Sequence, residues 1–419
     1  METSFSTSFV FDDALNEEAK ICVIGVGGGG GNAVNNMIEK GIGGVDFWAI
    51  NTDSQALSAN LAPNKIQAGS LLTKGLGTGA QPSIGAEAIE ENRADIENAL
   101  QGFDMVFITA GMGGGTGTGG VPIVAQIAKE LGILSVAIVT QPFECEGKRR
   151  MAVSNRGIER LKEEIDTLII IPNERLLDLS EATTTLVEAF EKADEVLYNA
   201  TRGISDLITV HGLINLDFAD VRTTMTKGGT ALMGASTASG ENRAERAATE
   251  ALSSPLLDGV SIQGAKNVLV NITAGKSLGI REATTATGII QKEAGDDVEV
   301  IFGTVIDNSM AGDLRITVIA TGFDTHKKLD GAARRKSLSL HADIPIAGYK
   351  GEENLKQLDI PAYRRRFATV STEPVDGGKG EESESNQGVR RLNSEEIQSS
   401  ERILKGDTDV PAFLRKMMD

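Results

Sequence analysis

The chain has 419 residues, of which 40% are hydrophobic, and it carries a formal net charge of −18. This length predicts two domains. The first 326 residues hold 43 acidic against 24 basic side chains, a surface that repels phosphate backbones and argues against a nucleic-acid partner. Two cysteines, Cys22 and Cys145, form no disulfide framework and favour a reducing compartment. The chain lacks the basic and apolar runs of a signal peptide and an apolar stretch of the ~18 residues that span a bilayer.

The first 170 residues alternate apolar strands with helical patterns. Continuous apolar runs are typical of strands buried on both faces, and they lie at 20–25, 45–50, 103–110, 133–140 and 166–171. This alternation predicts an α/β fold with a doubly wound, mostly parallel, Rossmann-type sheet. Ligands of such sheets bind beyond the carboxyl ends of the strands.

A glycine-rich segment follows the first predicted strand and precedes a helix predicted over 34–39. Three of its glycines have the G-x-G-x-x-G spacing of nucleotide-binding turns: Gly25, Gly27 and Gly30. This spacing alone fits a nicotinamide or flavin dehydrogenase as well as any other nucleotide binder.

A second glycine-rich segment lies between the strand at 103–110 and a helix predicted over 121–131. Five glycines in seven residues remove side chains from a turn, so that backbone N–H groups can approach an anion. Two threonines add hydroxyl donors, and the following helix directs its positive end to the same place. We therefore predict a phosphate-binding loop formed by Gly113, Gly114, Gly115, Thr116, Gly117, Thr118 and Gly119.

The second half of the chain begins with a long helix predicted at about 182–208, with one apolar stripe and a length of roughly 35–40 Å. Further strands are predicted at 230–236, 267–274, 297–307 and 313–322, with helices near 241–254 and 281–294. These elements predict a smaller α/β domain. From about residue 326 the apolar runs stop, and charge, Ser, Gly and Pro predict disorder.

These patterns divide the chain into six segments. We expect a flexible N-terminus (1–19), a nucleotide-binding domain (20–181), a central helix (182–211), a C-terminal α/β domain (212–325), a disordered linker (326–406) and a partner-binding peptide (407–419). A copy of the terminal Asp-x-Pro-Ala pattern within the linker, Asp359–Arg365, is either a second docking motif or a chance repeat.

Several of these segments resemble the tubulin-like GTPases, and among them the FtsZ proteins of bacterial cell division. Residues 113–119 match the signature GGGTGTG without a substitution, and further matches lie at 51–53, 75–80, 146–150, 215–220 and 409–416. The resemblance covers roughly residues 20–325 and the last dozen. Thr78 departs from it, because alanine is frequent in the family at this position.

The resemblance implies a GTPase that polymerises head to tail into filaments of the division ring, in the cytoplasm at mid-cell. It implies GTP or GDP with Mg²⁺ as ligands and no metal site made by the protein alone. Membrane tethers and division regulators would bind Asp409–Lys416. Because the sequence has no apolar stretch long enough to span a bilayer, we expect the chain to reach a membrane only through such tethers and not to insert into it.

The resemblance also assigns the nucleotide contacts. For the phosphates it implies the 113–119 segment together with Gly27, Gly28, Gly29, Gly30, Gly79 and Ala80. Glu146 and Arg150 correspond to ribose and phosphate contacts, and the matched Asn51 and Asp53 belong to the same site. For the base it implies Asn32, Asn173, Phe190 and Asp194.

The base contacts make chemical sense for guanine, because a carboxylate accepts from its N1–H and N2–H₂ groups, a donor pair that adenine lacks. Phe190 and Asp194 are four residues apart and share one helix face. Both residues also fit a simpler interpretation, in which Phe190 belongs to the apolar stripe and Asp194 is a solvated helix residue.

Two acids stand at the predicted start of a short helix, Asp217 and Asp220, with Asn215 in the same loop. Paired carboxylates can orient a water for attack on a γ-phosphate, although Asp217 would equally suit a helix N-cap. The long helix separates them from the implied base contacts by on the order of 20 Å or more. We therefore predict that they complete the site of the next subunit in a head-to-tail stack.

Two other functions remain open. A dinucleotide-dependent oxidoreductase would explain the first glycine segment, with Asp46 or Asp53 on the ribose, but not the second segment or the paired acids. A filament or scaffold protein without hydrolysis would need no paired acids, and this chain retains both.

Overall fold

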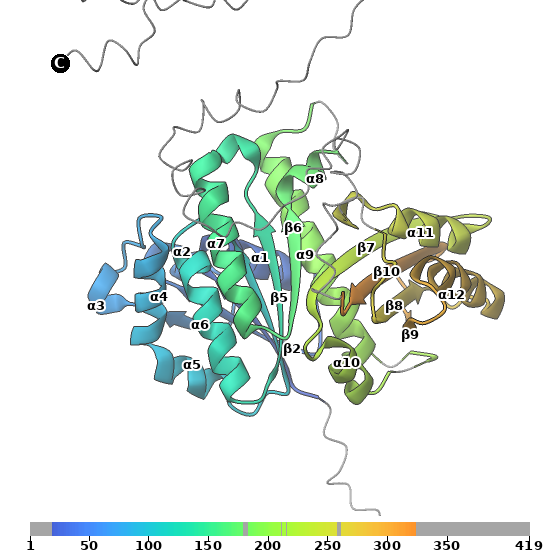
Figure 1. Cartoon of the computed structure of the whole chain (residues 1–419), viewed down its shortest axis with the longest axis horizontal. Helices are drawn as coiled ribbons and strands as arrows, with labels where there is room; N and C mark the ends of the chain where they lie inside the picture. Colours follow the sequence, from blue (N-terminus) through green and yellow to red (C-terminus); the bar gives the residue numbers. More distant parts are fainter. Residues whose placement is uncertain (1–18, 179–182, 211, 215, 258–260, 324–419) are drawn as a thin grey trace, which may run out of the picture. The chain divides into compact units, whose positions relative to one another are not determined.

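The computed structural model describes residues 19–178, 183–210, 212–214, 216–257 and 261–323 (Figure 1). The predicted linker, the terminal peptide and Asn215 lie outside these residues. Within them one continuous sheet has the strand order β3-β2-β1-β4-β5-β6-β7-β10-β8-β9. The strands are β1 Ile21–Val26, β2 Val45–Asn51, β3 Asn64–Gln67, β4 Met105–Gly111, β5 Leu134–Gln141, β6 Thr167–Pro172, β7 Gly229–Ser239, β8 Asn267–Ala274, β9 Glu299–Ile306 and β10 Asp313–Thr321.

The helices cover both faces of this sheet. They are α1 Gly27–Glu39, α2 Ser54–Ala59, α3 Ser70–Thr73, α4 Pro82–Glu91, α5 Arg93–Leu100, α6 Thr116–Glu130, α7 Lys148–Glu164, α8 Asn173–Leu177, α9 Leu186–Thr209, α10 Phe218–Met225, α11 Arg243–Leu252 and α12 Ile280–Ala294, with 3₁₀ turns η2 Glu144–Glu146 and η3 Pro255–Leu257. In the part of the chain that the structure describes, no helix is both long and apolar enough to cross a membrane.

The strands from β3 to β6 are all parallel, which confirms the predicted doubly wound sheet. The parallel half continues into the C-terminal half through β7, whose first three residues pair with β6. Strands β7, β10 and β8 are then antiparallel, and β9 is parallel to β8. All nine strands predicted from the sequence are therefore present. The tenth, β3, has only four residues and no apolar run.

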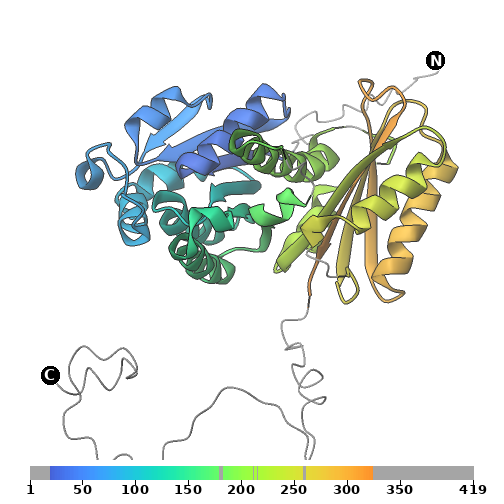
Figure 2. The ribbon, with the colours of Figure 1, turned by 90° about the horizontal axis from the view of Figure 1, so that it is seen from above.

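Alternate residues of the parallel strands enter two different cores, which explains why the strand sequences are apolar throughout. Ile21 and Val23 of β1 pack with helices α1, α9 and α10, whereas Cys22 and Ile24 pack with helices α4 to α7. Figure 2 shows α9, in green, between the parallel half of the sheet and the strands of the C-terminal half.

Helix α9 begins at Leu186, four residues later than predicted, because a capping box fixes its start. The Thr185 hydroxyl accepts from the Glu188 N–H at 3.3 Å, and the Glu188 carboxylate accepts from the Thr185 N–H at 2.7 Å. This reciprocal pair satisfies two of the N–H groups that a helix start leaves open.

Helices α1 and α6 begin earlier than predicted, at Gly27 and Thr116 instead of residues 34 and 121. Glycine is a poor helix former, so the sequence pattern indicated loops there. Close packing against the strands overrides this preference: a methyl group on Gly30 would lie 2.3 Å from the Thr109 carbonyl oxygen. The missing side chain lets α1 touch β4 directly.

We predict that Gly30→Ala destabilises the protein, because the added methyl group collides with the backbone of β4. The expected loss is about 1–3 kcal/mol of unfolding free energy. Gly28→Ala is the matched control, since a methyl group there meets no atom within 4 Å and alanine favours a helix over glycine by up to ~1 kcal/mol. Urea unfolding of both variants without nucleotide tests this, and equal stability of the two would contradict it.

Candidate functional site

A cavity of about 350 Å³ lies beyond the carboxyl ends of the parallel strands, at the edge that the sequence predicted. The ends of β1, β4 and β5, the first turns of α1 and α6, the start of α8 and one face of α9 line it. It brings together twelve of the predicted nucleotide contacts: Gly28, Gly29, Asn32, Gly114, Gly115, Thr116, Gly117, Glu146, Arg150, Asn173, Phe190 and Asp194.

The other predicted contacts do not line this cavity. Gly27 and Asn51 line a smaller adjoining one of about 150 Å³. Gly30, Gly113, Thr118 and Gly119 shape the backbone behind the cavity wall, and Gly79 and Ala80 lie in an exposed loop. The Asp53 carboxylate caps α2, accepting from the N–H groups of Gln55 and Ala56 at 2.9 and 3.1 Å.

At one end of the cavity the wall is formed by glycines at the starts of α1 and α6, which have no side chains. A methyl group placed on Gly28 or Gly114 would meet no protein atom within 4 Å, so both positions leave room for a ligand against the backbone. Because α1 and α6 both begin here, their unpaired N–H groups and positive dipole ends face the same space. This arrangement suits phosphate groups.

At this end of the cavity, three threonine hydroxyl groups link the end of β2, the loop that contains Thr78 and the first residue of α6. Thr116 Oγ1 lies 2.7 Å from Thr52 Oγ1 and 3.4 Å from Thr78 Oγ1. Thr118 has a different role from the donor expected in the sequence, since its buried hydroxyl accepts from the Gly113 N–H at 2.8 Å and fixes the loop. Thr52 lies within the matched segment 51–53, but the sequence assigned site roles only to its neighbours Asn51 and Asp53.

The other end of the cavity is aromatic and polar. Phe190, with 41% of its side chain exposed, meets Phe143 edge to face, with ring centroids 5.2 Å apart and an interplanar angle of 88°. Asn173 is buried, and its side-chain oxygen has no hydrogen-bond partner among the residues that the structure describes. A planar ligand that stacks on Phe190 and donates to Asn173 would satisfy both groups.

Asp194 stands beside this aromatic pair. Burial and, to a lesser extent, the negative charge of Glu191 together raise the pKa of its carboxyl group from 3.8 to about 6. A ligand that donates hydrogen bonds to the carboxylate would offset its desolvation. A more open groove of about 840 Å³ continues from Asn32 and Asp194 between α1 and α9.

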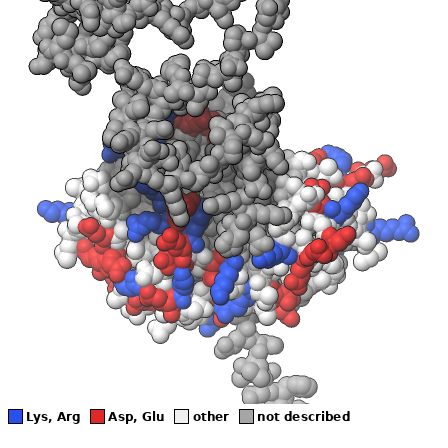
Figure 3. Space-filling view, viewed as in Figure 1, with Lys and Arg blue, Asp and Glu red and all other residues white. Residues whose placement is uncertain are grey.

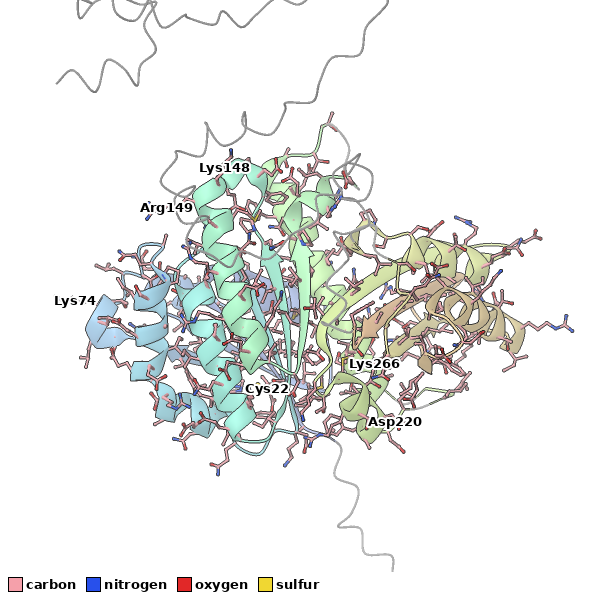
Figure 4. The ribbon with its side chains drawn as sticks, in the orientation of Figure 1. Cys22, Lys74, Lys148, Arg149, Asp220 and Lys266 are labelled. Atoms are coloured by element: carbon pink, nitrogen blue, oxygen red, sulfur yellow. The ribbon has the colours of Figure 1, made fainter. Side chains whose placement is uncertain are left out.

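An ion pair lies at the mouth of the cavity. Arg150 pairs with Glu146 across one turn of helix, and the second carboxylate oxygen of Glu146 accepts from the Phe143 N–H at 2.9 Å. Glu146 therefore positions both Arg150 and the aromatic pair. Lys148 and Arg149, on the first turn of α7, are at this edge of the molecule (Figure 4).

Asp217 and Asp220 lie at the opposite edge of the sheet. Arg222 of α10 donates to the carbonyl oxygen of Asp104, which immediately precedes β4, at 3.3 Å. Gly111, at the other end of β4, lines the cavity. At about 3.3 Å per residue, the strand separates the two edges by about 20 Å. Figure 4 shows Asp220 far from Lys148 and Arg149.

The side chains of Asp217 and Asp220 are both exposed to solvent. Asp217 occupies the N-cap position of α10, but its side chain accepts no capping hydrogen bond. Neither carboxylate has a hydrogen-bond or ion-pair partner among the residues that the structure describes. The N-cap interpretation therefore does not explain Asp217.

Two observations argue against a dinucleotide oxidoreductase. Asp46 lies at the start of β2, about 16 Å along the strand from the cavity edge, and Asp53 is engaged in capping. Neither acid is in place for a ribose. On the face drawn in Figure 3, Asp and Glu side chains are interspersed with Lys and Arg over the described residues.

No cluster of three or more His, Cys, Asp or Glu side chains that could hold a metal ion occurs among the described residues.

Comparisons with known proteins agree with this geometry. The GTPase domain of the tubulin/FtsZ family matches residues 20–181, and the C-terminal domain of the FtsZ family matches residues 229–324. An FtsZ dimer from M. jannaschii is 44% identical, with a TM-score of 0.71, over 74% of this chain and 90% of that chain. CetZ2 from Haloferax volcanii, in a GTPγS-bound protofilament, is 21% identical with a TM-score of 0.62, over 76% and 98%; this match concerns the fold alone. The chain belongs to the tubulin/FtsZ family of GTPases, in the group that carries the FtsZ C-terminal domain.

Proposed function

We propose that this GTPase assembles head to tail into filaments of the bacterial division ring, and that each active site is divided between two subunits. One observation carries the proposal: the cavity and the paired acids lie at opposite edges of one sheet, about 20 Å apart along β4. Within one subunit the carboxylates cannot reach a nucleotide in the cavity. In a stack they complete the cavity of the next subunit.

A contact between two different edges of the same molecule does not close on itself, and repetition therefore produces a filament. Both edges have the exposed apolar side chains that such a contact would bury. Leu186 and Val187 are 61% and 67% exposed at the start of α9, and Leu213 is 72% exposed just before the acids. The M. jannaschii relative described as a dimer supports self-association of this fold.

The proposed chemistry follows from the charged groups at the contact between two subunits: the nucleotide phosphates in one cavity and the carboxylates of the neighbour. The N–H groups at the starts of α1 and α6, with Thr116, hold the phosphates and balance their charge. Asp217 and Asp220 of the neighbour orient and polarise the attacking water. Mg²⁺, bound with the nucleotide, would further neutralise the phosphates. Because the carboxylates reach the site only at the contact, assembly switches hydrolysis on.

The base end selects guanine. Asp194 accepts from N1–H and N2–H₂, and the ring stacks on Phe190, which Phe143 holds in place. The unpartnered oxygen of Asn173 and the amide of Asn32 provide further polar contacts within the same cavity. Glu146 and Arg150 close the mouth on the ribose and phosphate side.

The domain limits and the cellular role are part of this proposal and rest on the resemblance. Residues 20–181 bind the nucleotide, 182–211 form the central helix and 212–325 the second domain. The segment 326–406 acts as a tether, and Asp409–Lys416 binds membrane tethers and division regulators. The filament then works in the cytoplasm at mid-cell. Presence of both acids, exposed and unpaired, favours hydrolysis over a passive scaffold.

A complementation experiment tests the divided site. The double variant Asp217→Ala/Asp220→Ala keeps its cavity, and Gly114→Leu fills the cavity but keeps the acids. Neither substitution disturbs a packed or capped group. Each variant alone should lack GTP turnover, and their mixture should regain it, because the acids of one complete the cavity of the other.

Phosphate release from the single proteins and from the mixture gives the readout, with co-sedimentation as the control for assembly. The double variant should still bind GDP. Turnover at the wild-type rate by the acid variant alone, or no recovery in a mixture that co-sediments, would sink the proposal.

The raised pKa of Asp194 predicts a pH dependence of binding. If only the carboxylate form holds guanine, the ionised fraction falls about tenfold between pH 7 and pH 5 for a pKa of about 6. The affinity for GDP should fall by about the same factor, beyond the pH effect of the phosphates. Calorimetry measures it, with Asp194→Asn as the reference that lacks this group.

Glu191→Gln provides a second arm, because it removes the negative charge that raises the pKa of Asp194. The loss of affinity should then occur at a lower pH than in the wild type. An identical pH profile in the wild type and in Asp194→Asn would contradict the assignment of Asp194 to the base.

A further inference from the structure

Thr78 is the one side chain of the Gly77–Ala80 turn that points under the cavity. It is 7% exposed and lines the cavity, whereas Gly79 and Ala80 are exposed. The turn is tight, with left-handed backbone at Gly77 (φ +80°) and Gly79 (φ +57°) on either side. The backbone carbonyl oxygen of Thr78 accepts from the Gln81 N–H at 3.2 Å. The backbone therefore holds the Thr78 hydroxyl in a fixed place.

The hydroxyl of Thr78 points to that of Thr116. Thr116 Oγ1 lies 3.4 Å from Thr78 Oγ1 and 2.7 Å from Thr52 Oγ1. All three residues are at most 8% exposed. The three hydroxyls link the end of β2, the Gly77–Ala80 turn and the first residue of α6.

Either hydroxyl of each pair can be the donor, so this cluster has several possible proton arrangements, and one of them leaves the Thr116 proton free for a ligand. A hydroxyl group has one proton to donate and two lone pairs to accept. When Thr52 and Thr78 both donate to Thr116, the lone pairs of Thr116 are filled and its own proton needs another acceptor. Thr116 lines the cavity at the helix start where phosphates fit, so in this arrangement a phosphate oxygen of a nucleotide placed there would be the acceptor.

We infer that Thr78 is a positioning residue for GTP: its hydroxyl donates to Thr116 and thereby directs the Thr116 proton toward a phosphate oxygen. This inference rests on the proposed placement of GTP in the cavity. It adds a role for a side chain that the sequence singled out only as a departure from the family pattern. Alanine at this position would leave Thr52 as the single donor to Thr116.

Thr78→Val tests the inference, because valine keeps the shape of threonine and removes only the hydroxyl group. We expect GTP and GDP affinity to fall about three- to tenfold, the range that one hydrogen bond typically contributes. Thr78→Ser should restore the affinity. Thermal unfolding without nucleotide should be the same for the wild type, Thr78→Val and the exposed control Thr249→Val, since a purely structural role would lower stability instead.

A double-mutant cycle shows whether Thr78 acts through Thr116. In a Thr116→Val background, Thr78→Val should cause no further loss of affinity. Full additivity, an affinity of Thr78→Val equal to the wild type, or a failure of serine to restore it would overturn the inference.

Asp194→Asn, at the other end of the cavity, distinguishes a failure of this inference from a failure of the proposed placement of the nucleotide. If Asp194→Asn weakens binding and Thr78→Val does not, the nucleotide is in the cavity and Thr78 has no positioning role. If neither substitution changes binding, the placement of GTP in this cavity is itself wrong, and the inference fails with it.

Discussion

The polarity of the parallel sheet is the constraint on which the rest of this molecule depends. Parallel strands bring all their carboxyl ends to one edge and all their amino ends to the other. The glycine turns follow carboxyl ends and so converge on the cavity, whereas α10 is bonded to the amino ends of β4 and β6, through Asp104 and Thr167. The separation of Asp217 from the cavity is thus a property of the fold, and no side-chain movement within one subunit removes it.

Helix α9 runs from the cavity toward the opposite edge and contacts both halves of the sheet. Its first half lines the cavity with Phe190 and Asp194. In its second half Arg202 donates to Asp206, to the Tyr198 hydroxyl and to Asp307 beyond β9, each at 2.9 Å. The helix is therefore tied to the end of β9, the outermost strand of the C-terminal half.

The sequence predicted the parts of the site that depend on local pattern and failed where tertiary packing decides. Apolar runs located nine strands to within three residues at each end, and in the parallel half these runs are continuous because the strands are buried on both faces. The starts of α1 and α6 were placed too late, since glycine disfavours a helix in isolation but permits the contact of Gly30 with β4. The hydroxyl cluster of Thr52, Thr78 and Thr116 joins three distant segments, and no spacing along the chain could reveal it. Asp53 matched a nucleotide motif, yet its carboxylate caps α2.

The divided active site is tested most directly by the specific GTPase activity over a range of protein concentrations, with light scattering recorded on the same samples. Our account predicts almost no turnover at low concentration and a rise in specific activity at the concentration where scattering appears. Specific activity that is constant at all concentrations, including those without scattering, would place the whole active site within one subunit and contradict the account.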